Sequence, residues 1–152
     1  MPTFKTEIMI DAPIDKVFEF CTNPDNIKES WPRDLVKESE NVSGQKSEVG
    51  SEMKVEGHYM GKSEEMTIEV TQKEQNKRLV TRQIDGPFES WESIQEFQNN
   101  GNTSTMVSHT INYKLPTASK IGNFLTGKKA EDKIRQGLEQ AAQTVKSKLE
   151  TQ

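Results

Sequence analysis

The stretch AEDKIRQGLEQAAQTVKSKL, residues 130–149, decides the fold of this chain. Its apolar side chains recur at steps of three and four, which places Ile134, Leu138, Val145 and Leu149 on one stripe of an α-helix. Charged and amide side chains lie outside the stripe. Because an apolar stripe of this length must be covered by other parts of the chain, we expect a long amphipathic helix packed against a sheet formed by the preceding residues.

Small residues occupy the middle of the same stripe, at Gly137, Ala141 and Ala142. A helix with so little bulk midway either approaches the sheet closely or leaves a space between helix and sheet. In the second case the space is a pocket, and Gly137 lies at its floor.

The stripe cannot be extended far toward the N-terminus, because Ile121 and Leu125 fall off it. A break in the helix is needed, and Gly127 is the natural position. We therefore expect the long helix to begin near Lys128 and residues 119–125 to form a separate short helix or lid.

Alternation of apolar and polar residues, the period of β-strands, fills most of the chain before this helix. The alternating segments are residues 4–10, 53–59, 66–71, 91–97 and 105–113, with less regular strands at 35–42 and 79–84. Two short helices, starting at Pro13 and after Asn23, separate the first strand from the others. These patterns predict a single α+β domain over residues 1–152. In it, a curved antiparallel sheet of about six to seven strands wraps around the C-terminal helix.

Composition limits the classes of partner. A net charge of -4 with both signs interleaved argues against nucleic acid. The single cysteine, Cys21, permits neither an intrachain disulfide nor a thiolate zinc site, and its place on an apolar helix face indicates a small buried hydrophobe. The chain has no apolar run of the roughly 18 residues that span a bilayer, and no targeting segment precedes the first strand. We expect a soluble, cytoplasmic protein without integral membrane association.

Several short motifs resemble one known superfamily when taken in order. They are residues 10–18 (IDAPIDKVF), 49–51 (VGS), 86–91 (GPFESW), Phe97, and 105–116 (TMVSHTINYKLP). Together they resemble the START-related, helix-grip (SRPBCC) proteins, which include polyketide cyclases and dehydrases, lipid-transfer domains and the major birch-pollen allergen. That superfamily has no shared catalytic motif, so the resemblance assigns no catalytic residue to this chain.

The resemblance implies a ligand cavity between the curved sheet and the C-terminal helix. Its lining would consist of the inward-facing residues Met53, Val55, Tyr59, Met66, Ile68, Trp91, Ser93, Gln95, Phe97, Val107, His109, Ile111, Tyr113, Ile134, Gly137, Leu138 and Ala141. The alternative is that these residues form an ordinary core. The polar members Ser93, Gln95 and His109 need hydrogen-bond partners if they are buried, and a ligand or an ordered water would supply them.

His109 is the inward-facing one of two histidines, which makes it a candidate acid, base or hydrogen-bond donor. Tyr113 is the second catalytic candidate, and the alternative for His109 is a histidine hydrogen-bonded within the core. The other histidine, His58, shares its phase with charged residues, so a two-histidine metal site is not expected. The glycines match no phosphate-binding loop. We expect neither a metal nor a cofactor.

Three functions remain open on these observations. The leading one is binding, transport or sequestration of a hydrophobic small molecule, such as a lipid, an isoprenoid or a polyketide-like compound. The second is catalysis of the polyketide cyclase or dehydratase type in the same cavity, with His109 transferring the proton. The third is a co-chaperone-like module that works through its exposed surface, with a protein partner that the sequence does not identify.

Overall fold

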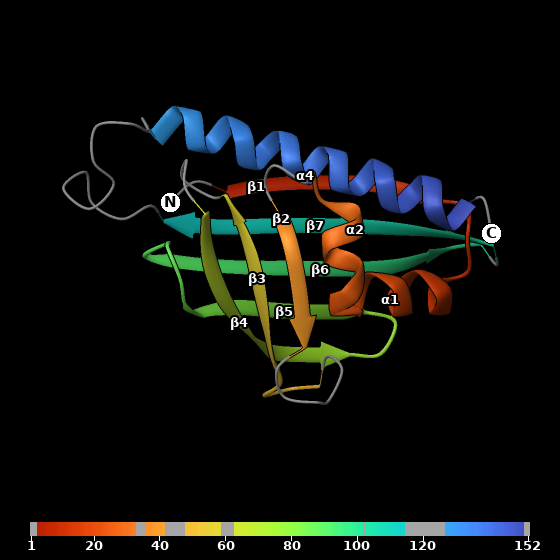
Figure 1. The fold of residues 1–152 in the computed structure, drawn as a ribbon. Helices are drawn as coiled ribbons and strands as arrows, with labels where there is room; N and C mark the ends of the chain where they lie inside the picture. Colours follow the sequence, from red (N-terminus) through yellow and green to blue (C-terminus); the bar gives the residue numbers. More distant parts are fainter. Residues whose placement is uncertain are drawn as a thin grey trace.

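A seven-stranded antiparallel sheet curves around a long C-terminal helix in the computed structural model (Figure 1). The structure describes residues 3–32, 36–41, 48–58, 63–101, 103–114 and 127–150. The elements in chain order are β1 (Thr3–Ile10), α1 (Ile14–Thr22), the 3-10 turn η1 (Pro24–Asn26), α2 (Ile27–Ser30), β2 (Val36–Asn41), β3 (Glu52–His58), β4 (Ser63–Glu74), β5 (Arg78–Asp85), β6 (Ser90–Asn100), β7 (Ser104–Lys114) and α4 (Gly127–Glu150). This architecture confirms the predicted α+β class and the curved antiparallel sheet.

Strand order in the sheet is β1-β7-β6-β5-β4-β3-β2, so each strand from β2 to β7 pairs with its neighbours in sequence. The exception is β1, which pairs with β7 and brings Thr6 opposite His109. Consecutive antiparallel pairing is what short hairpin connections between alternating strands produce. The N-terminal strand is thereby placed beside the last strand of the sheet.

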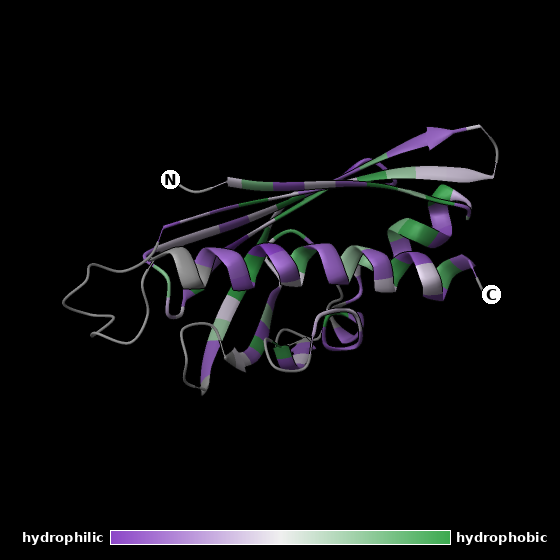
Figure 2. Ribbon diagram, turned by 90° about the horizontal axis from the view of Figure 1, so that it is seen from above, coloured by the Kyte–Doolittle hydropathy of each residue, from purple (hydrophilic) through white to green (hydrophobic). Residues whose placement is uncertain are grey.

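The helix α4 extends across the sheet and contacts β1, α1 and α2 (Figure 1). Its start at Gly127 agrees with the predicted start near Lys128. Ile134 and Leu138 are 1% exposed, whereas Arg135 and Glu139 are exposed, as the apolar stripe predicts. Figure 2 shows this alternation along the helix as apolar and polar segments. The predicted helix or lid at 119–125 lies outside the described residues.

The strand at 79–84 is the one whose inward face the sequence leaves ambiguous. In the structure Leu79, Val80 and Thr81 are all buried. The pairing of β4 with β5 shifts its register between Val70 and Gln72, at a bulge or irregularity. A bulge disturbs the two-residue period, so apolar residues in successive positions are buried here.

Two separate apolar clusters make up the core. The first joins β2 to β7 with Ile134 and Leu138 of α4. The second joins α1 and the ends of β1, β6 and β7 with Leu149 at the other end of α4. Helix and sheet are therefore packed together at two places along α4. No helix within the described residues combines the length and the apolar character needed to cross a membrane.

Candidate functional site

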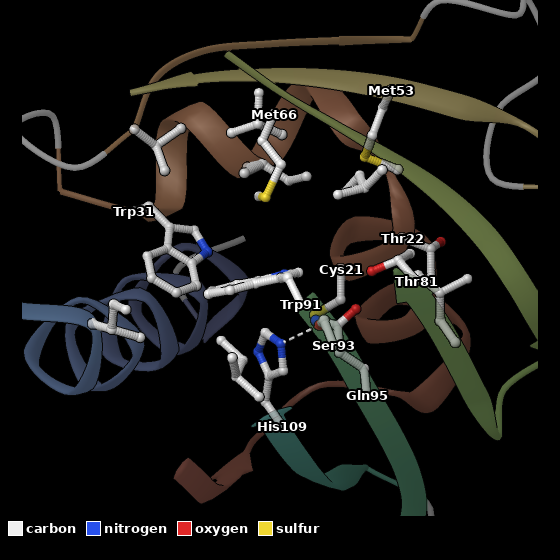
Figure 3. Close-up of a pocket in the computed structure, with 17 residues that line it drawn as sticks. Cys21, Thr22, Trp31, Met53, Met66, Thr81, Trp91, Ser93, Gln95 and His109 are labelled. Carbon is white, nitrogen blue, oxygen red and sulfur yellow. Dashed lines mark hydrogen bonds between the residues drawn. The ribbon is translucent and has the colours of Figure 1, made fainter. Parts of the chain in front are cut away.

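A cavity of about 110 Å³ lies between the curved sheet and the helices, and we call it the main cavity. All seven elements from β2 to β7 and α4 contribute to its wall, together with α1 and α2. Its lining is Cys21, Thr22, Ile27, Trp31, Val36, Met53, Val55, Met66, Ile68, Leu79, Thr81, Trp91, Ser93, Gln95, His109, Ile111 and Ile134. In Figure 3, Ser93, Gln95 and His109 gather at one side of the cavity, with Met53 and Met66 at the other. The wall is thus mostly apolar, with this polar group at one side and the two threonines Thr22 and Thr81 apart from it.

A second cavity of about 60 Å³ lies toward α1 and the C-terminal half of α4. Its lining is Thr6, Ile8, Ile10, Phe20, Cys21, Asn26, Ile27, Ser30, Trp31, Gln95, Val107, His109, Ala141, Ala142 and Val145. Five residues line both cavities and therefore stand between them, and we call them the dividing wall: Cys21, Ile27, Trp31, Gln95 and His109. Gln95 and His109 come from the sheet, and the other three come from the helical segment between β1 and β2.

A hydrogen bond between side chains organises the polar part of the wall. Ser93 Oγ and His109 Nε2 are 2.7 Å apart, which links β6 to β7 in addition to the backbone ladder (Figure 3). Gln95 is the direct cross-strand neighbour of His109 in the same pair of strands. Because side chains directly opposite each other in an antiparallel pair lie on the same face, the sheet itself brings these three polar groups together.

His109 is uncharged at neutral pH in this environment. Burial lowers the pKa of His109 to about 4, because the cation would lose hydration without gaining a counter-charge. A neutral imidazole carries one hydrogen, and so does a serine hydroxyl. One of these two hydrogens is used within the Ser93–His109 pair. The other remains free to be donated, whichever tautomer is present.

Cys21 is half-buried, and it lines both cavities. Its accessible surface therefore faces the cavities rather than the outside of the protein. Burial raises the pKa of the Cys21 thiol to about 12. The residue therefore stays protonated at neutral pH, in agreement with its interpretation as a small buried hydrophobe.

Next to the main cavity lies an aromatic cluster of Phe4, Phe88, Trp91 and Tyr113. The Phe88 and Trp91 ring centroids are 4.8 Å apart, and those of Phe4 and Tyr113 are 5.7 Å apart. Gln83 holds Phe88 in place, because its side-chain Nε2 donates to the Phe88 carbonyl at 2.7 Å and its Oε1 accepts from the Phe88 amide at 3.2 Å. This cluster fixes the position of Trp91 at the cavity wall.

Most of the expected lining residues do reach a cavity. The main cavity contains Met53, Val55, Met66, Ile68, Trp91, Ser93, Gln95, His109, Ile111 and Ile134. Val107 and Ala141 line the second cavity instead. Tyr59 lies outside the described residues. These placements locate the side chains and leave their role in ligand binding as a prediction.

Four expected lining residues, Phe97, Tyr113, Gly137 and Leu138, line neither of these two cavities and are buried in the core. Phe97 packs edge-on against Phe18, with ring centroids 5.0 Å apart, because α1 covers that end of β6. Tyr113 is fully buried among aromatic rings, and Leu138 is in the first core cluster. Gly137 is buried and lines neither cavity, since the helix contributes Ile134 to one and Ala141 to the other.

Tyr113, the second catalytic candidate, lines neither of these two cavities. Its hydroxyl is buried and has no hydrogen-bond partner in the described part of the chain. Desolvation by burial, followed by the charge of Glu131, raises the pKa of Tyr113. A catalytic role for Tyr113 stays a prediction.

Sequence reasoning missed the contribution of the helical segment and of β5. Ile27 and Trp31 lie in and after a four-residue helix, too short to show a helical period. Leu79 and Thr81 lie in the strand whose period is disturbed by the register shift. Cys21 could have been found, because its apolar helix face was already assigned. In the described residues, no group of three or more His, Cys, Asp or Glu side chains is placed to hold a metal.

Solved structures with the same architecture support the fold. A START superfamily protein from Mycobacterium smegmatis aligns with 98% of this chain and 97% of its own, at 14% identity and a TM-score of 0.77. The Zhui aromatase/cyclase of a Streptomyces species aligns with 98% and 93% at 14% identity and a TM-score of 0.76. A major latex-like protein of Panax ginseng aligns with 97% of each chain at 13% identity and a TM-score of 0.72. At these identities the likeness shows the fold alone.

Family membership follows from the sequence. No curated protein matches this chain. Residues 1–150 match the family described as "Polyketide cyclase / dehydrase and lipid transport". Since this match extends over nearly the whole chain, and the curved sheet around a C-terminal helix agrees with it, the chain belongs to that family.

Proposed function

We propose that this protein binds a hydrophobic small molecule in the main cavity, as a carrier or a store for that molecule. The observation that carries the proposal is a cavity between sheet and helices whose wall is mostly apolar and holds a cluster of hydrogen-bonding side chains. This is the usual composition of a small-ligand site. The match to a family that includes lipid-transport proteins supports the same class of function.

The size of the cavity fits a small apolar group and can adapt to a larger one. An apolar protein cavity of about 150 Å³ is known to hold benzene, so about 110 Å³ suits a smaller ring or a branched alkyl group. Met53 and Met66 form part of the wall. Because methionine side chains are unbranched and change rotamer readily, this part of the wall can move to admit a longer ligand.

The polar cluster supports a bound molecule because one of its members, Gln95, has no partner within it. Gln95 lines both cavities, and its side-chain amide makes no hydrogen bond with any described residue. A ligand oxygen, or a water in its place, would give this amide a partner.

The chemistry of His109 favours binding over the alternative of cyclase or dehydratase catalysis. With a pKa of about 4, the imidazole is a weak base and holds no proton to give as a general acid near neutral pH. Its hydrogen-bond partner is a serine, and no carboxylate lies in the described lining to raise its basicity. The co-chaperone-like alternative receives no support from the described surface, where the large exposed apolar residues are the isolated Val49 and Ile84.

Ligand binding can be tested with the two tryptophans of the chain, since Trp31 and Trp91 both line the main cavity. Titration with an anilinonaphthalene dye should change tryptophan emission and give a saturable dissociation constant. Native mass spectrometry of the purified protein should show any ligand retained from the host.

Filling the cavity supplies the control for this test. Val55→Phe adds bulk at a buried lining position, and Glu56→Phe adds the same ring at the next, exposed residue of β3. Val55→Phe should weaken dye binding at least tenfold while Glu56→Phe leaves it unchanged. Absence of saturable binding in the wild-type protein, or equal binding in both variants, would contradict the proposal.

A further inference from the structure

The main cavity and the second cavity are separated only by side chains. Each is set in its own apolar surroundings: the main cavity in the first core cluster, with Met66 and Ile68, and the second in residues such as Ile10 and Val107 of the second cluster. Between the two apolar spaces stands the dividing wall, which carries the polar groups of Gln95 and His109. From one end to the other, the lining is mostly apolar in the main cavity, polar at Gln95 and His109, and then mixed in the second cavity, where Thr6, Asn26 and Ser30 accompany the apolar residues.

The dividing wall consists of two halves that meet without a hydrogen bond between them. Cys21, Ile27 and Trp31 form the half from the helical segment, and Gln95 and His109 form the half from the sheet. The sheet half is anchored by the ladder of β6 and β7. The helical half includes α2, a four-residue helix whose Lys28 amide donates to Ser39 Oγ of β2 at 3.2 Å and whose Ile27, together with the adjacent Trp31, packs against the first core cluster.

Trp31 is only partly buried, and its side chain makes no hydrogen bond with a described residue. Rotation of the Trp31 side chain would join the two cavities without displacing α2. The sheet half, with its polar side chains, would stay in place.

The polar side chains at this position match one functional group. The Ser93–His109 pair keeps one hydrogen to donate, as shown above, and the Gln95 amide nitrogen carries two more. Two donors on neighbouring strands can both bond to one oxygen that accepts two hydrogen bonds, and a carbonyl oxygen has two lone pairs.

Charge is disfavoured throughout this space. Among the described residues that line the two cavities, none is a lysine, arginine, aspartate or glutamate. The pKa of His109 is consistent with this, since burial lowers it to about 4. A ligand carboxylate or phosphate would meet the same desolvation cost with no cation to compensate it.

We propose that the two cavities are the two halves of one ligand site, which holds an elongated, uncharged molecule with apolar ends and a ketone or ester carbonyl near its middle, bonded by Gln95 and the Ser93–His109 pair. This inference rests on the proposed function and specifies its ligand class. The apolar ends occupy the main cavity and the second cavity, and Trp31 moves aside to let the molecule pass between them.

Probes that have the same number of carbon atoms but differ in the position or presence of the carbonyl test where the carbonyl lies. The probes are symmetric dialkyl ketones, the methyl ketones of the same length, the n-alkanes and the fatty carboxylates, titrated against tryptophan emission. We expect the symmetric ketones to bind about tenfold tighter than the other three classes. Gln95→Leu should remove this preference, and Gln98→Leu, an exposed glutamine of the same strand, should keep it.

A substitution in the second cavity tests whether the ligand spans both spaces. Ala141 is 5% exposed and lines the second cavity but not the main cavity. Ala141→Leu should therefore weaken the binding of long symmetric ketones about tenfold and leave the binding of short ones unchanged. Gln143→Leu adds the same bulk at an exposed position of α4 and should change neither. If Ala141→Leu does not fold, Ala142→Leu, at another residue of the second cavity, serves the same purpose.

The outcomes separate this inference from the proposed function. Equal affinity for ketones and alkanes, or tighter binding of methyl ketones or carboxylates, overturns the central-carbonyl assignment while binding itself stands. Long ketones that bind Ala141→Leu as tightly as the wild type overturn the joined cavities. Failure of every probe to bind the wild type removes the proposed function together with the inference.

Discussion

Ser93 Oγ lies 2.7 Å from His109 Nε2, so a hydrogen bond between two side chains holds β6 to β7 at the polar side of the main cavity. The bond needs a neutral or donating imidazole and a hydroxyl in a fixed rotamer. Its two residues are diagonal neighbours on the inner face of the sheet, since Ser93 pairs with Ile111 and His109 with Gln95. The Ser93–His109 hydrogen bond therefore depends both on the protonation state of the His109 imidazole and on the register in which β6 pairs with β7.

The neutral state of His109 should make stability depend on pH. Its pKa is about 4 in the folded protein against about 6.5 in the unfolded chain, so the unfolded chain binds the proton first as pH falls. Above about pH 6.5 His109 is neutral in both states, and the folded protein has its full stability. As pH falls toward about 4, preferential protonation of the unfolded chain lowers the free energy of unfolding, by about 3 kcal/mol at most. Chemical unfolding at several pH values should show a shallower dependence in His109→Gln than in the wild type. Parallel curves for the two proteins would contradict the shifted pKa.

Cys21 should react slowly with thiol reagents in the folded protein. Its pKa is raised from about 9 to about 12, which lowers the thiolate fraction about a thousandfold at mildly alkaline pH. Because the chain has one cysteine, alkylation with iodoacetamide followed by mass spectrometry gives an unambiguous rate. The denatured protein is the control and should react at the rate of a free thiol. A native rate close to the denatured one would show that the thiol is open to solvent.

The link between Gln83 and Gly86 should appear as coupling between two substitutions. A Cβ at residue 86 would lie 2.5 Å from Gln83 Oε1, the atom that accepts from the Phe88 amide. Gly86→Ala should therefore cost about 1–2 kcal/mol by displacing the Gln83 side chain, and Gln83→Ala a similar amount by removing both bonds to Phe88. In the Gln83→Ala background, Gly86→Ala should cost much less, which a double-mutant cycle of unfolding free energies measures. Additive costs would show that the two residues act independently.

The end of α4 should be held to β1 through a lysine and a glutamate. Lys146 Nζ donates to the Met9 carbonyl at 2.7 Å and to the Glu150 carboxylate, which also accepts from the Asp11 amide at 2.9 Å. The hydrogen bond from Lys146, followed by that from Asp11, lowers the pKa of Glu150. In Lys146→Met the pKa of Glu150 measured by NMR should rise toward its ordinary value. The Asp11 amide should then exchange faster with solvent.

The matched control for that measurement is Lys133→Met, at another lysine of the same helix. This variant should leave both the Glu150 pKa and the Asp11 exchange rate as they are in the wild type. An unchanged Glu150 pKa in Lys146→Met would contradict the contact.

Periodicity predicted the fold because each regular element follows its own period. The stripe of Ile134, Leu138 and Leu149 and the alternation of Met53 and Val55 are local signals, and burial in the structure follows them. The candidate lining was predicted on the sheet, where Ser93, Gln95 and His109 share one phase, and on the long helix, where Ile134 and Ala141 lie on its apolar stripe. A two-residue period tells which face a side chain occupies.

That period cannot tell which neighbour covers the side chain. Phe97 has the same phase as Gln95, yet it packs against Phe18, because α1 reaches one end of β6 and leaves the middle open. Trp31 and Ile27 carry no period at all, since their position depends on how a four-residue helix docks on β2 and α4. These contacts are tertiary, and only the folded chain specifies them.

The pairing of β1 with β7 also fixes when the site can exist during synthesis. Thr6 must find His109 across about a hundred residues of chain, and contacts of that separation form late and slowly. On the ribosome, the hairpins from β3 to β7 can pair one after another, but their apolar inner face stays uncovered until α4 has emerged. A nascent chain that stops before α4 would expose an open sheet in place of a cavity. The helix that closes the main cavity is thus also the segment that covers the apolar face of the sheet and lowers the risk of aggregation.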